Sequence, residues 1–417
     1  MKILTVDIGT GTQDIFLYNS QLHIENGFKL VVPSPTMIVH QRVKAATRSR
    51  APILLTGVMM GGGPSAWAVE AHARAGIETY ATPAAARTLN DELDKVRALG
   101  VEIVSDDEAA ALPDSVQRIE FLDFNLPAIQ QALSPFGIDL SDLDAIAVAV
   151  FDHGDAPAGV SDRQFRFDYL DQRLRARNSL ASFAFLADDI PPSMTRLQAV
   201  ARSAGDLPCP LVVMDTAPAA VLGATFDPNV ATRKRKIVCN VGNFHTLAFR
   251  LGEGEIEGLF EHHTGEIDLP RLESLLRALA DGSLKHEDVF DDMGHGALMY
   301  AKEPFTLGED AFDVVVTGPR RSMFSPTPAL IIPEGDSVAR NPFRNQKRNK
   351  FRATNLHTIR ERGALRPYFA APFGDMMIAG CFGLLAAAAE ILPGLTEAVS
   401  RSMKEASAGR PPWENES

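Results

Sequence analysis

Several short polar clusters combine histidine with carboxylate side chains, the combination on which acid–base and metal chemistry depends. They are Asp152-His153-Gly154-Asp155, Asp162-Arg163, Glu261-His262-His263 and His295, which stands between two glycines. If the fold brings them together, these side chains could form a substrate site or a divalent-metal site. Adjacent histidines on a strand point to opposite faces, so His262 and His263 would not both ligate one ion without a bend. Ordinary hydrogen bonding is the alternative for each histidine.

A second chemical signal is a pair of turns that contain glycine and follow short apolar segments. The first is Asp7-Ile-Gly-Thr-Gly-Thr12 and the second is Asn240-Val-Gly-Asn-Phe-His-Thr246. A dinucleotide-binding turn of the Rossmann type needs a third glycine and a following helix, whereas a strand pattern follows Thr12. A P-loop is excluded because no Gly-Lys-Ser or Gly-Lys-Thr occurs in the sequence.

The elements that must position these residues form two runs of strands and helices. The first run has predicted strands at Lys2–Val6, Asp14–Tyr18, Lys29–Val32, Pro52–Thr56, Ile119–Phe124, Ala145–Phe151 and Pro210–Met214, and helices at Met37–Arg48, Phe165–Arg177 and Ser193–Ser203. The second has predicted strands at Ile237–Cys239, Thr246–Leu251, Ile256–Phe260 and Asp313–Val316, and helices at Leu269–Ala280, Leu298–Lys302 and Asp375–Leu392. Three antiparallel strands followed by alternating helix and strand predict a mixed sheet.

Shared spacing indicates an internal duplication. Asp215-x3-Ala219-Ala220-x2-Gly223 and Asp375-x3-Ala379-Gly380-x2-Gly383 keep the same intervals, and the two glycine turns form a second matching pair. Small residues three or four apart share one helical face and let two helix backbones approach closely. If the two helices cross, we expect a hinge there; the alternative is chance similarity between small-residue helices.

In chain order these segments resemble the five motifs of the superfamily of actin, sugar kinases and seventy-kilodalton heat-shock ATPases. Val314-Val-Val-Thr317-Gly318-Pro319 is similar to the adenosine motif, and the two small-residue helices are similar to the connecting helices. The resemblance implies an α/β fold of two duplicated RNase H-like (actin-like ATPase) domains with a central cleft. Their expected bounds are residues 1–224 and 225–402, followed by a disordered tail over 403–417.

The resemblance also implies ATP and Mg²⁺ as cofactors and gives residues their roles. Asp7 would hold hydrated Mg²⁺ and act in catalysis, and Asp215 would be a general base or a ligand of metal-bound water, with a helix N-cap as its alternative. The residues implied in cofactor binding are Gly9, Thr10, Gly11, Thr12, Asn240, Gly242, Thr246, Thr317, Gly318 and Asp375. Asn240 replaces the usual Asp, so nucleotide binding is expected to survive better than hydrolysis.

More narrowly, the sequence resembles a family labelled as pyruvate formate-lyase activating enzymes. A radical-SAM activase needs three closely spaced cysteines for its iron–sulfur cluster. The cysteines here, Cys209, Cys239 and Cys381, are dispersed, so we do not expect that activity.

Three functions follow from these residues. The first is an ATP-dependent phosphotransferase or ATPase, which would act on an unidentified small-molecule substrate. The second is a non-catalytic nucleotide sensor that acts through a protein partner. The third is a metal-dependent enzyme that uses His153, His262, His263 and His295, with Asp155, Asp162 and Arg163 nearby.

The net charge of the chain indicates which classes of binding partner are unfavourable. The 417 residues carry a net charge of −12, which disfavours nucleic acid and anionic membranes as partners. We expect a cytoplasmic protein, because the N-terminus lacks a signal-peptide pattern and no apolar run reaches membrane-helix length. Nine Lys and Arg residues between Arg340 and Arg366 mark a basic segment at about 336–366, expected as a flexible insertion, a partner-docking strip or a lid.

Overall fold

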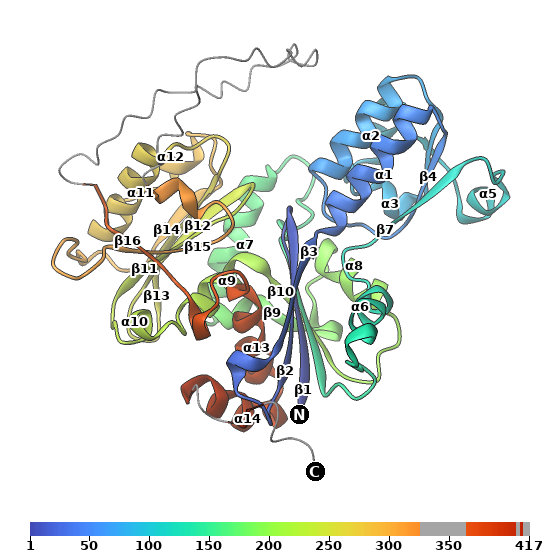
Figure 1. Ribbon diagram of the computed structural model, residues 1–417. Coiled ribbons are helices and arrows are strands. Elements are labelled where there is room, and N and C mark those ends of the chain that lie inside the picture. Colours follow the sequence, from blue (N-terminus) through green and yellow to red (C-terminus); the bar gives the residue numbers. More distant parts are fainter. Residues whose placement is uncertain (326–363, 406–408, 412–417) are drawn as a thin grey trace, which may run out of the picture.

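The computed structural model describes residues 1–325, 364–405 and 409–411. This part of the chain forms a mixed α/β fold with two six-stranded sheets and one four-stranded sheet, flanked by helices (Figure 1). The predicted fold class of mixed sheets flanked by helices is confirmed at this level.

The first six-stranded sheet has the strand order β3-β2-β1-β8-β10-β9. Its strands are β1 (Lys2–Ile8), β2 (Thr12–Asn19), β3 (Phe28–Pro33), β8 (Ala145–Val150), β9 (Ala184–Leu186) and β10 (Leu211–Asp215). All six residues of β8 are buried, as expected of a central strand covered on both faces. Ile146 and Val148 pack toward α6 (Leu126–Leu133), α7 (Asp162–Ala176) and α8 (Thr195–Ala204), whereas Ala147 and Ala149 pack against α13 (Ala379–Ile391).

The second six-stranded sheet has the strand order β14-β13-β12-β11-β15-β16. Its strands are β11 (Lys236–Val241), β12 (His245–Leu251), β13 (Ile256–His263), β14 (Gly296–Met299), β15 (Val314–Thr317) and β16 (Pro367–Phe369), and its helices are α11 (Leu269–Asp281) and α12 (His286–Phe290). In both sheets the first three strands pair antiparallel and the next two join in parallel. Five strands of the second sheet therefore repeat the order and pairing sense of five strands in the first.

The third sheet lies within the first half of the chain, between β3 and β8, and forms the blue and cyan lobe in Figure 1. Its four parallel strands run in the order β6-β5-β4-β7 and are β4 (Ile53–Gly57), β5 (Thr79–Ala81), β6 (Glu102–Ile103) and β7 (Gln117–Phe121). The helices of this lobe are α1 (Pro35–Ser49), α2 (Pro64–Arg74), α3 (Pro83–Ala86), α4 (Leu93–Ala98) and α5 (Asp106–Ala111). The strands predicted at Pro52–Thr56 and Ile119–Phe124 exist, but they pair with each other here and do not extend the first mixed sheet.

The two helices of small residues, α9 (Thr216–Ala224) and α13, pack directly against each other. A Cβ atom added to Gly223 would overlap the Ala379 carbonyl oxygen, and one added to Gly383 would overlap the Ala219 carbonyl oxygen. The predicted close approach of the two helix backbones is confirmed. The crossing lies at the lower centre of Figure 1, beside α14 (Pro393–Lys404).

Two predicted elements differ from the structure. The helix predicted at Leu298–Lys302 is wrong, because Gly296–Met299 pairs with β13 as the edge strand β14. The last helix begins at Ala379 instead of Asp375, since the Asp375 carboxylate accepts a hydrogen bond from Met377 N at 2.8 Å in a turn before the helix. The remaining helices are α10 (Pro228–Ala231) and the 3₁₀ turns Ile24–Asn26, Ser134–Phe136, Leu180–Phe183, Ala187–Asp189, Arg321–Phe324 and Pro372–Gly374.

The predicted basic segment at 336–366 lies outside the described residues apart from its last three. Of these, Leu365 is buried and Arg366 pairs with Asp313 at 2.9 Å. The predicted disordered tail over 403–417 starts too early, because α14 continues to Lys404, and Arg410 bridges to Leu22. Residues 406–408 and 412–417 lie outside the described part.

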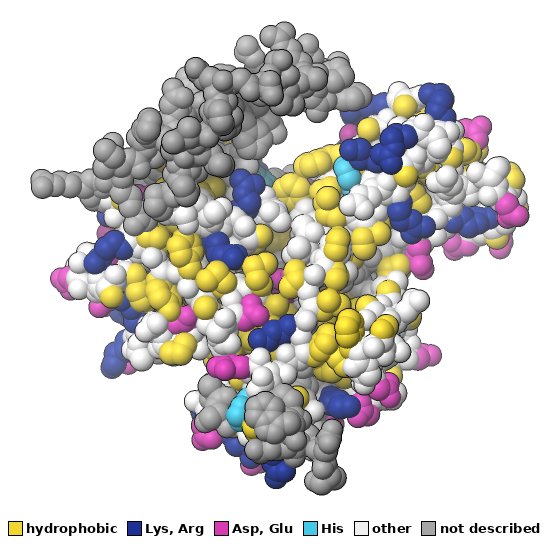
Figure 2. Space-filling model, in the orientation of Figure 1, with side chains coloured by type: hydrophobic (Ala, Val, Ile, Leu, Met, Phe, Trp, Pro, Cys, Tyr) yellow, Lys and Arg dark blue, Asp and Glu magenta, His cyan; other side chains and the backbone are white. Residues whose placement is uncertain are grey.

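The surface mixes both signs of charge where it can be seen. On the face in Figure 2, Lys and Arg side chains alternate with Asp and Glu side chains over the lobe that carries α1 and α2. Among the described residues, no helix combines the length and apolar character needed to cross a membrane.

Candidate functional site

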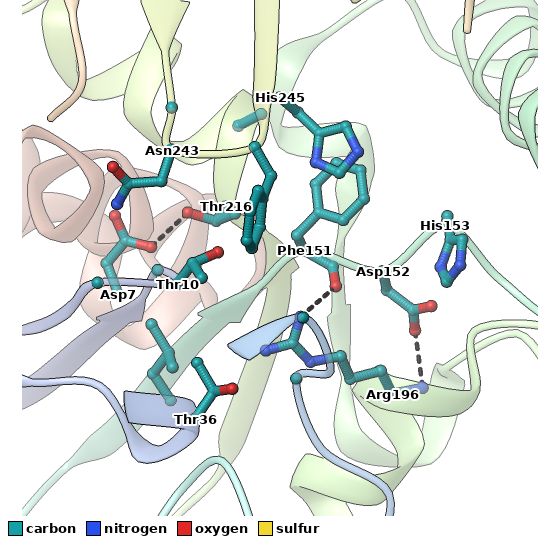
Figure 3. A pocket seen from close by; sticks show the side chains of 18 of the residues that line it. Asp7, Thr10, Thr36, Phe151, Asp152, His153, Arg196, Thr216, Asn243 and His245 are labelled. Atoms are coloured by element: carbon teal, nitrogen blue, oxygen red, sulfur yellow. Dashed lines mark hydrogen bonds between the residues drawn. The ribbon is translucent and has the colours of Figure 1, made fainter. Parts of the chain in front are cut away.

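A cavity of about 620 Å³ lies between the two six-stranded sheets and the inserted lobe. Both predicted glycine turns line this cavity, and they approach each other closely, since a Cβ atom added to Gly11 would lie 2.9 Å from Asn243 Nδ2. Figure 3 shows the Asn243 side chain directed toward Asp7, with Thr10 nearby. From the predicted set, the cavity wall includes Asp7, Gly9, Thr10, Gly11, Thr12, Asn240, Gly242, Thr317 and Gly318.

The first turn joins β1 to β2 and is held by hydrogen bonds within the turn and from Ser34, the residue after β3. Gly9 N donates to Thr12 O at 2.9 Å, and Ser34 Oγ donates to Thr10 O at 2.5 Å. The hairpin register places Asp7 opposite Asp14, so two carboxylates meet at the base of the turn. Ser34 N also donates to Gly11 O at 3.2 Å, and all four residues of the turn, 9–12, line the cavity.

Burial determines the protonation of these two carboxyl groups. It raises the pKa of Asp7 to about 6, although Thr216 Oγ1 donates to Asp7 Oδ1 at 2.5 Å and opposes the shift. Burial, with the charge of Asp7, raises the pKa of Asp14 to about 8. Two crowded carboxylates of this kind gain stability in the charged form when a cation binds between them.

The second turn connects β11 to β12. Gly242 N donates to His245 O at 2.9 Å, which closes the turn. Gly318 has φ +96°, and a Cβ atom there would lie 2.5 Å from Asn240 Oδ1, so the predicted adenosine segment packs against this turn. Thr246 is directed elsewhere: it is buried, its hydroxyl lies 2.9 Å from Thr264 Oγ1, and it is absent from the cavity wall.

Asp215 does not reach the cavity wall. Its Oδ1 accepts from Ala217 N at 3.1 Å, which is the N-cap alternative, and its Oδ2 accepts a hydrogen bond from Arg166 Nη1. Burial raises the pKa of Asp215, and the Arg166 guanidinium opposes that shift. Both oxygens are engaged inside the protein, so the predicted general-base role has no support from this geometry.

Asp375 also lies off the cavity wall, because its carboxylate faces Lys29 Nζ at 3.6 Å. Its neighbours Met376 and Met377 line the cavity instead. The matched spacing therefore predicts correctly that the two helices pack together. It does not bring the two carboxylates, Asp215 and Asp375, into the cavity.

The histidine clusters converge only in part. His153, Asp162, Arg163, His263 and His295 line the cavity, whereas Asp155 is exposed and outside it. His262 is buried on the other face of β13, with Nε2 3.7 Å from Asp292. The prediction that adjacent histidines face opposite ways is confirmed, so His262 is not part of the cluster.

The structure adds His245, which sequence reasoning missed. His245 on β12 pairs in register with His263 on β13, and His295 stands just before β14 on the next strand. The ring centroids are 5.1 Å apart for His245 and His263, 5.1 Å for His245 and His295, and 4.7 Å for His263 and His295. The ring of His245 also stacks on Phe151 at 4.1 Å (Figure 3). Side chains alternate between the two faces along β12 and β13, so this pairing follows from the hairpin register. The sequence alone does not give that register.

A second missed group is Arg196 with its carboxylate partners. Arg196 Nε donates to Asp123 Oδ2 at 2.8 Å and Nη1 donates to Phe151 O at 2.7 Å. Asp152 accepts from the backbone N–H groups of Arg196 and Leu197, both at 2.9 Å, and so anchors the start of α8. No local motif marks Arg196, because its partners lie on other elements.

Among solved structures, the chain is similar to a ROK hexokinase from Thermus thermophilus, with 13% identity and a TM-score of 0.22 over 68% of this chain. An exopolyphosphatase-like protein is 10% identical, with a TM-score of 0.23 over 70% of this chain. A carbohydrate kinase from Novosphingobium aromaticivorans is 13% identical, with a TM-score of 0.20 over 66% of this chain and 71% of the kinase. The chain spans 61% of the length of both the hexokinase and the exopolyphosphatase-like protein. Scores at this level carry no conclusion about activity.

The family comparison is more informative than the structural one. No curated protein matches the chain. Residues 60–323 match the model of a family described as "Putative pyruvate format-lyase activating enzyme (DUF1786)". Since this match covers more than half of the chain and agrees with the narrower resemblance of the sequence, the chain belongs to that family.

Proposed function

We propose that this protein binds a nucleotide with Mg²⁺ in the cavity between its two six-stranded sheets and acts as an ATP-dependent phosphotransferase or ATPase. In this proposal, residues 1–224 and 225–402 are duplicated RNase H-like domains. The observation that carries it is that both glycine turns, one from each six-stranded sheet, line one cavity of about 620 Å³. That volume lies within the range of small-molecule sites.

The two turns supply donors suited to phosphate oxygens. The N–H groups of Thr10, Gly11 and Asn243 donate to no other described residue, and the Thr10 and Thr12 hydroxyls line the same wall. Backbone amides presented by a glycine turn form an anion-binding concavity. Arg87 and Arg321 also line the cavity and would add positive charge for an anionic ligand.

The residues at the base of the first turn fit a Mg²⁺ ion. Asp14 Oδ1 is buried without a hydrogen-bond partner among the described residues, and it belongs to the residue paired with Asp7 in the hairpin. Mg²⁺ in phosphate sites is commonly held by one or two carboxylates, water and phosphate oxygens. Asp7 and Asp14 would hold it, and the ion would supply charge neutralisation for the phosphates.

A nucleotide sensor that acts through a protein partner is the second candidate. The observation that favours it is the engagement of Asp215 with Arg166, together with Asn240 in the position where the resemblance expects an Asp. Both features remove groups that could promote phosphate transfer, whereas the two glycine turns still line the cavity.

We do not extend the family description to radical-SAM chemistry. Cys239 and Cys381 are buried on different elements, and none of the three cysteines lines the cavity. Among the described residues, the group of His, Cys, Asp or Glu side chains close enough to share an ion contains no cysteine. Iron–sulfur clusters of that enzyme class depend on three converging thiolates.

Thermal unfolding with ATP, with and without Mg²⁺, tests binding. At about 100 times the dissociation constant, MgATP should stabilise the native state by about 2.7 kcal/mol and raise Tm. Asp7→Asn should abolish the Mg²⁺-dependent part without lowering the Tm of the free protein, because burial already disfavours the Asp7 charge. Asp142→Asn, which changes an exposed carboxylate paired with Lys2, should leave the shift unchanged.

A wild-type Tm that does not respond to MgATP would refute the proposal. If the shift occurs, an assay of ADP formation separates the two candidates, because both phosphate transfer and hydrolysis convert ATP to ADP. Turnover that disappears in Asp7→Asn supports the enzyme, whereas binding without turnover across a panel of sugar and other hydroxyl acceptors supports the sensor.

A further inference from the structure

The same cavity contains a group of side chains that nucleotide binding leaves unused. His245, His263 and His295 each offer one ring nitrogen, and these three atoms all lie within 4.8 Å of one another. The group includes neither Asp7 nor Asp14, so it is distinct from the carboxylates at the first turn. We propose that His245, His263 and His295 bind one divalent transition-metal ion, with Zn²⁺ as the representative ion.

Three neighbouring strands fix the positions of the rings. His245 and His263 are direct cross-strand partners in the β12–β13 pair. His295 N donates to Glu261 O at 2.9 Å, which places His295 at the start of the next strand, beside β13. Side chains directly opposite each other on antiparallel strands lie on the same face of the sheet, so the backbone itself assembles the set.

The polar atoms of this group lack partners inside the protein. Both ring nitrogens of His295 are buried without a hydrogen-bond partner among the described residues, and the side chain is only 4% exposed. Buried polar atoms in native proteins nearly always have a partner, and a site for an ion is one recognised reason for an exception. The orphaned nitrogens of His295 are therefore the observation that points to a ligand.

The protonation state suits metal binding. Burial lowers the pKa of His295 to about 2 and that of His245 to about 3, and it also lowers the pKa of His263. Neutral imidazole is the form that coordinates metals. Three imidazoles without a thiolate suit Zn²⁺ and the neighbouring transition metals, whereas Mg²⁺ prefers oxygen ligands.

The Glu261 carboxylate lies next to His295, where it could accept a hydrogen bond from a metal-bound histidine. Glu261 Oε1 is fully buried, lies 3.5 Å from His295 Nδ1 and has no hydrogen-bond partner among the described residues. Its other oxygen accepts from Arg166 Nε at 3.2 Å, which holds the carboxylate in position. Metal-bound histidines commonly donate their second N–H to such a carboxylate, and a small rotation of His295 would make that bond and leave Nε2 for the ion.

The site would be open on one side. All three histidines line the cavity. A metal ion held by them would therefore have a free coordination position that faces the cavity. Three protein ligands with a free position are typical of catalytic zinc sites, in which water or a substrate oxygen occupies the fourth place. His153, Asp162 and Arg163 line the same cavity and would contact the ligand of such an ion.

Metal titration of the full chain, without nucleotide, tests this site. After removal of metal with a chelator, Co²⁺ should bind with one-to-one stoichiometry and give the visible absorption of a low-coordinate nitrogen site, and Zn²⁺ should displace it. His263→Gln should weaken Zn²⁺ binding at least tenfold, and His245→Gln should do the same. Both side chains are only partly buried, which favours folding of the variants, and circular dichroism checks it.

His262→Gln is the matched control, because it changes the adjacent histidine on the opposite face of β13 and should keep wild-type Zn²⁺ affinity. Asp7→Asn should also keep it, which separates this ion from the one in the nucleotide proposal. Equal Zn²⁺ affinity in wild type, His263→Gln and His245→Gln would overturn the inference, as would a wild-type protein that binds neither Co²⁺ nor Zn²⁺.

Discussion

Arg166 occupies the centre of the protein, where a charged side chain is most costly to bury. It is fully buried on α7, donates to Asp152 O at 3.0 Å, contacts Asp215, and reaches Glu261 on β13 at 3.2 Å. Its ring neighbour is Phe151, 4.9 Å from the guanidinium carbon. The Arg166 side chain thus connects the chain just after β8 and the end of β10 in the first sheet to β13 in the second sheet.

Replacing Arg166 by Met should be strongly destabilising, because Asp215 and Glu261 would be left buried without a counter-charge. Breaking such a buried pair costs about 3–5 kcal/mol, which a urea titration would detect as a lower unfolding midpoint. Arg175→Met on the exposed side of the same helix removes a surface pair with Asp171 and should leave the midpoint unchanged. An Arg166→Met midpoint equal to that of Arg175→Met would contradict this account.

Local sequence was sufficient to locate some site residues but not others. The two glycine turns could be predicted because a turn depends on a few adjacent residues. The pairing of His245 with His263 could not, since it depends on the hairpin register and on a bulge between Arg250 and Leu251. Asp215 matched its motif by spacing, but a residue 49 positions away takes its carboxylate, and no spacing rule reveals that contact.

At the scale of elements, the crossing of α9 and α13 depends on two glycines. Gly223 and Gly383 each face a backbone carbonyl of the other helix, so the helix axes approach as closely as backbones allow. Gly380, on the same helix as Gly383, faces the Asp7 carboxylate, and a Cβ atom there would overlap Asp7 Oδ2. The helix that carries the crossing therefore also limits the space around the first turn.

Gly223→Ala should destabilise the protein even though alanine is the better helix former. The new methyl group would meet the Ala379 carbonyl oxygen, a rigid backbone atom, and overpacking of this kind costs about 1–3 kcal/mol or more. Gly394→Ala on α14 is the matched control, because nothing lies within 4 Å of the added Cβ. It should be neutral or stabilise by up to about 1 kcal/mol. Equal urea midpoints for the two variants would show that the crossing tolerates a larger residue.

Most elements were predictable from apolar periodicity, and the failures share one cause. Leu298–Lys302 has no strong pattern of its own, and pairing with β13 makes its first residues part of a strand. Strands β4 and β7 were predicted, but their pairing was not, because 59 residues, including two further strands, separate them in sequence. Pairing across long separations is set by tertiary packing, which local propensity does not report.

At the scale of the molecule, the two six-stranded sheets are connected firmly along one side of the cavity. Helix α7 reaches across it: Arg163 donates to Phe290 O at 2.9 Å, and Asp171 accepts from Tyr300 Oη at 2.9 Å. Asn178, just past the helix, donates to Ile256 O at 3.1 Å. The inserted lobe has fewer bonds to the second sheet, so we expect changes in cavity width to occur there.

The contact between the inserted lobe and the second glycine turn is aromatic. The Trp67 ring on α2 lies 5.6 Å from the Phe244 ring in an edge-to-face arrangement, and Trp67 is 58% exposed. A Cβ atom on Gly63 would lie 2.8 Å from Phe244, so the loop before α2 also touches that turn. A ligand between the turns would change the distance between these two rings.

Tryptophan fluorescence should therefore report nucleotide binding. The chain has two tryptophans, Trp67 and Trp413, and the second lies outside the described residues. We expect MgATP to shift the emission of the wild type and of Trp413→Phe, because exposed Trp67 contacts Phe244, which lines the cavity, and a movement of the lobe would change this contact. Trp67→Phe should lose the response while its Tm still rises with MgATP. A Trp413→Phe protein whose Tm rises with MgATP but whose emission stays constant would show that the inserted lobe does not move on binding.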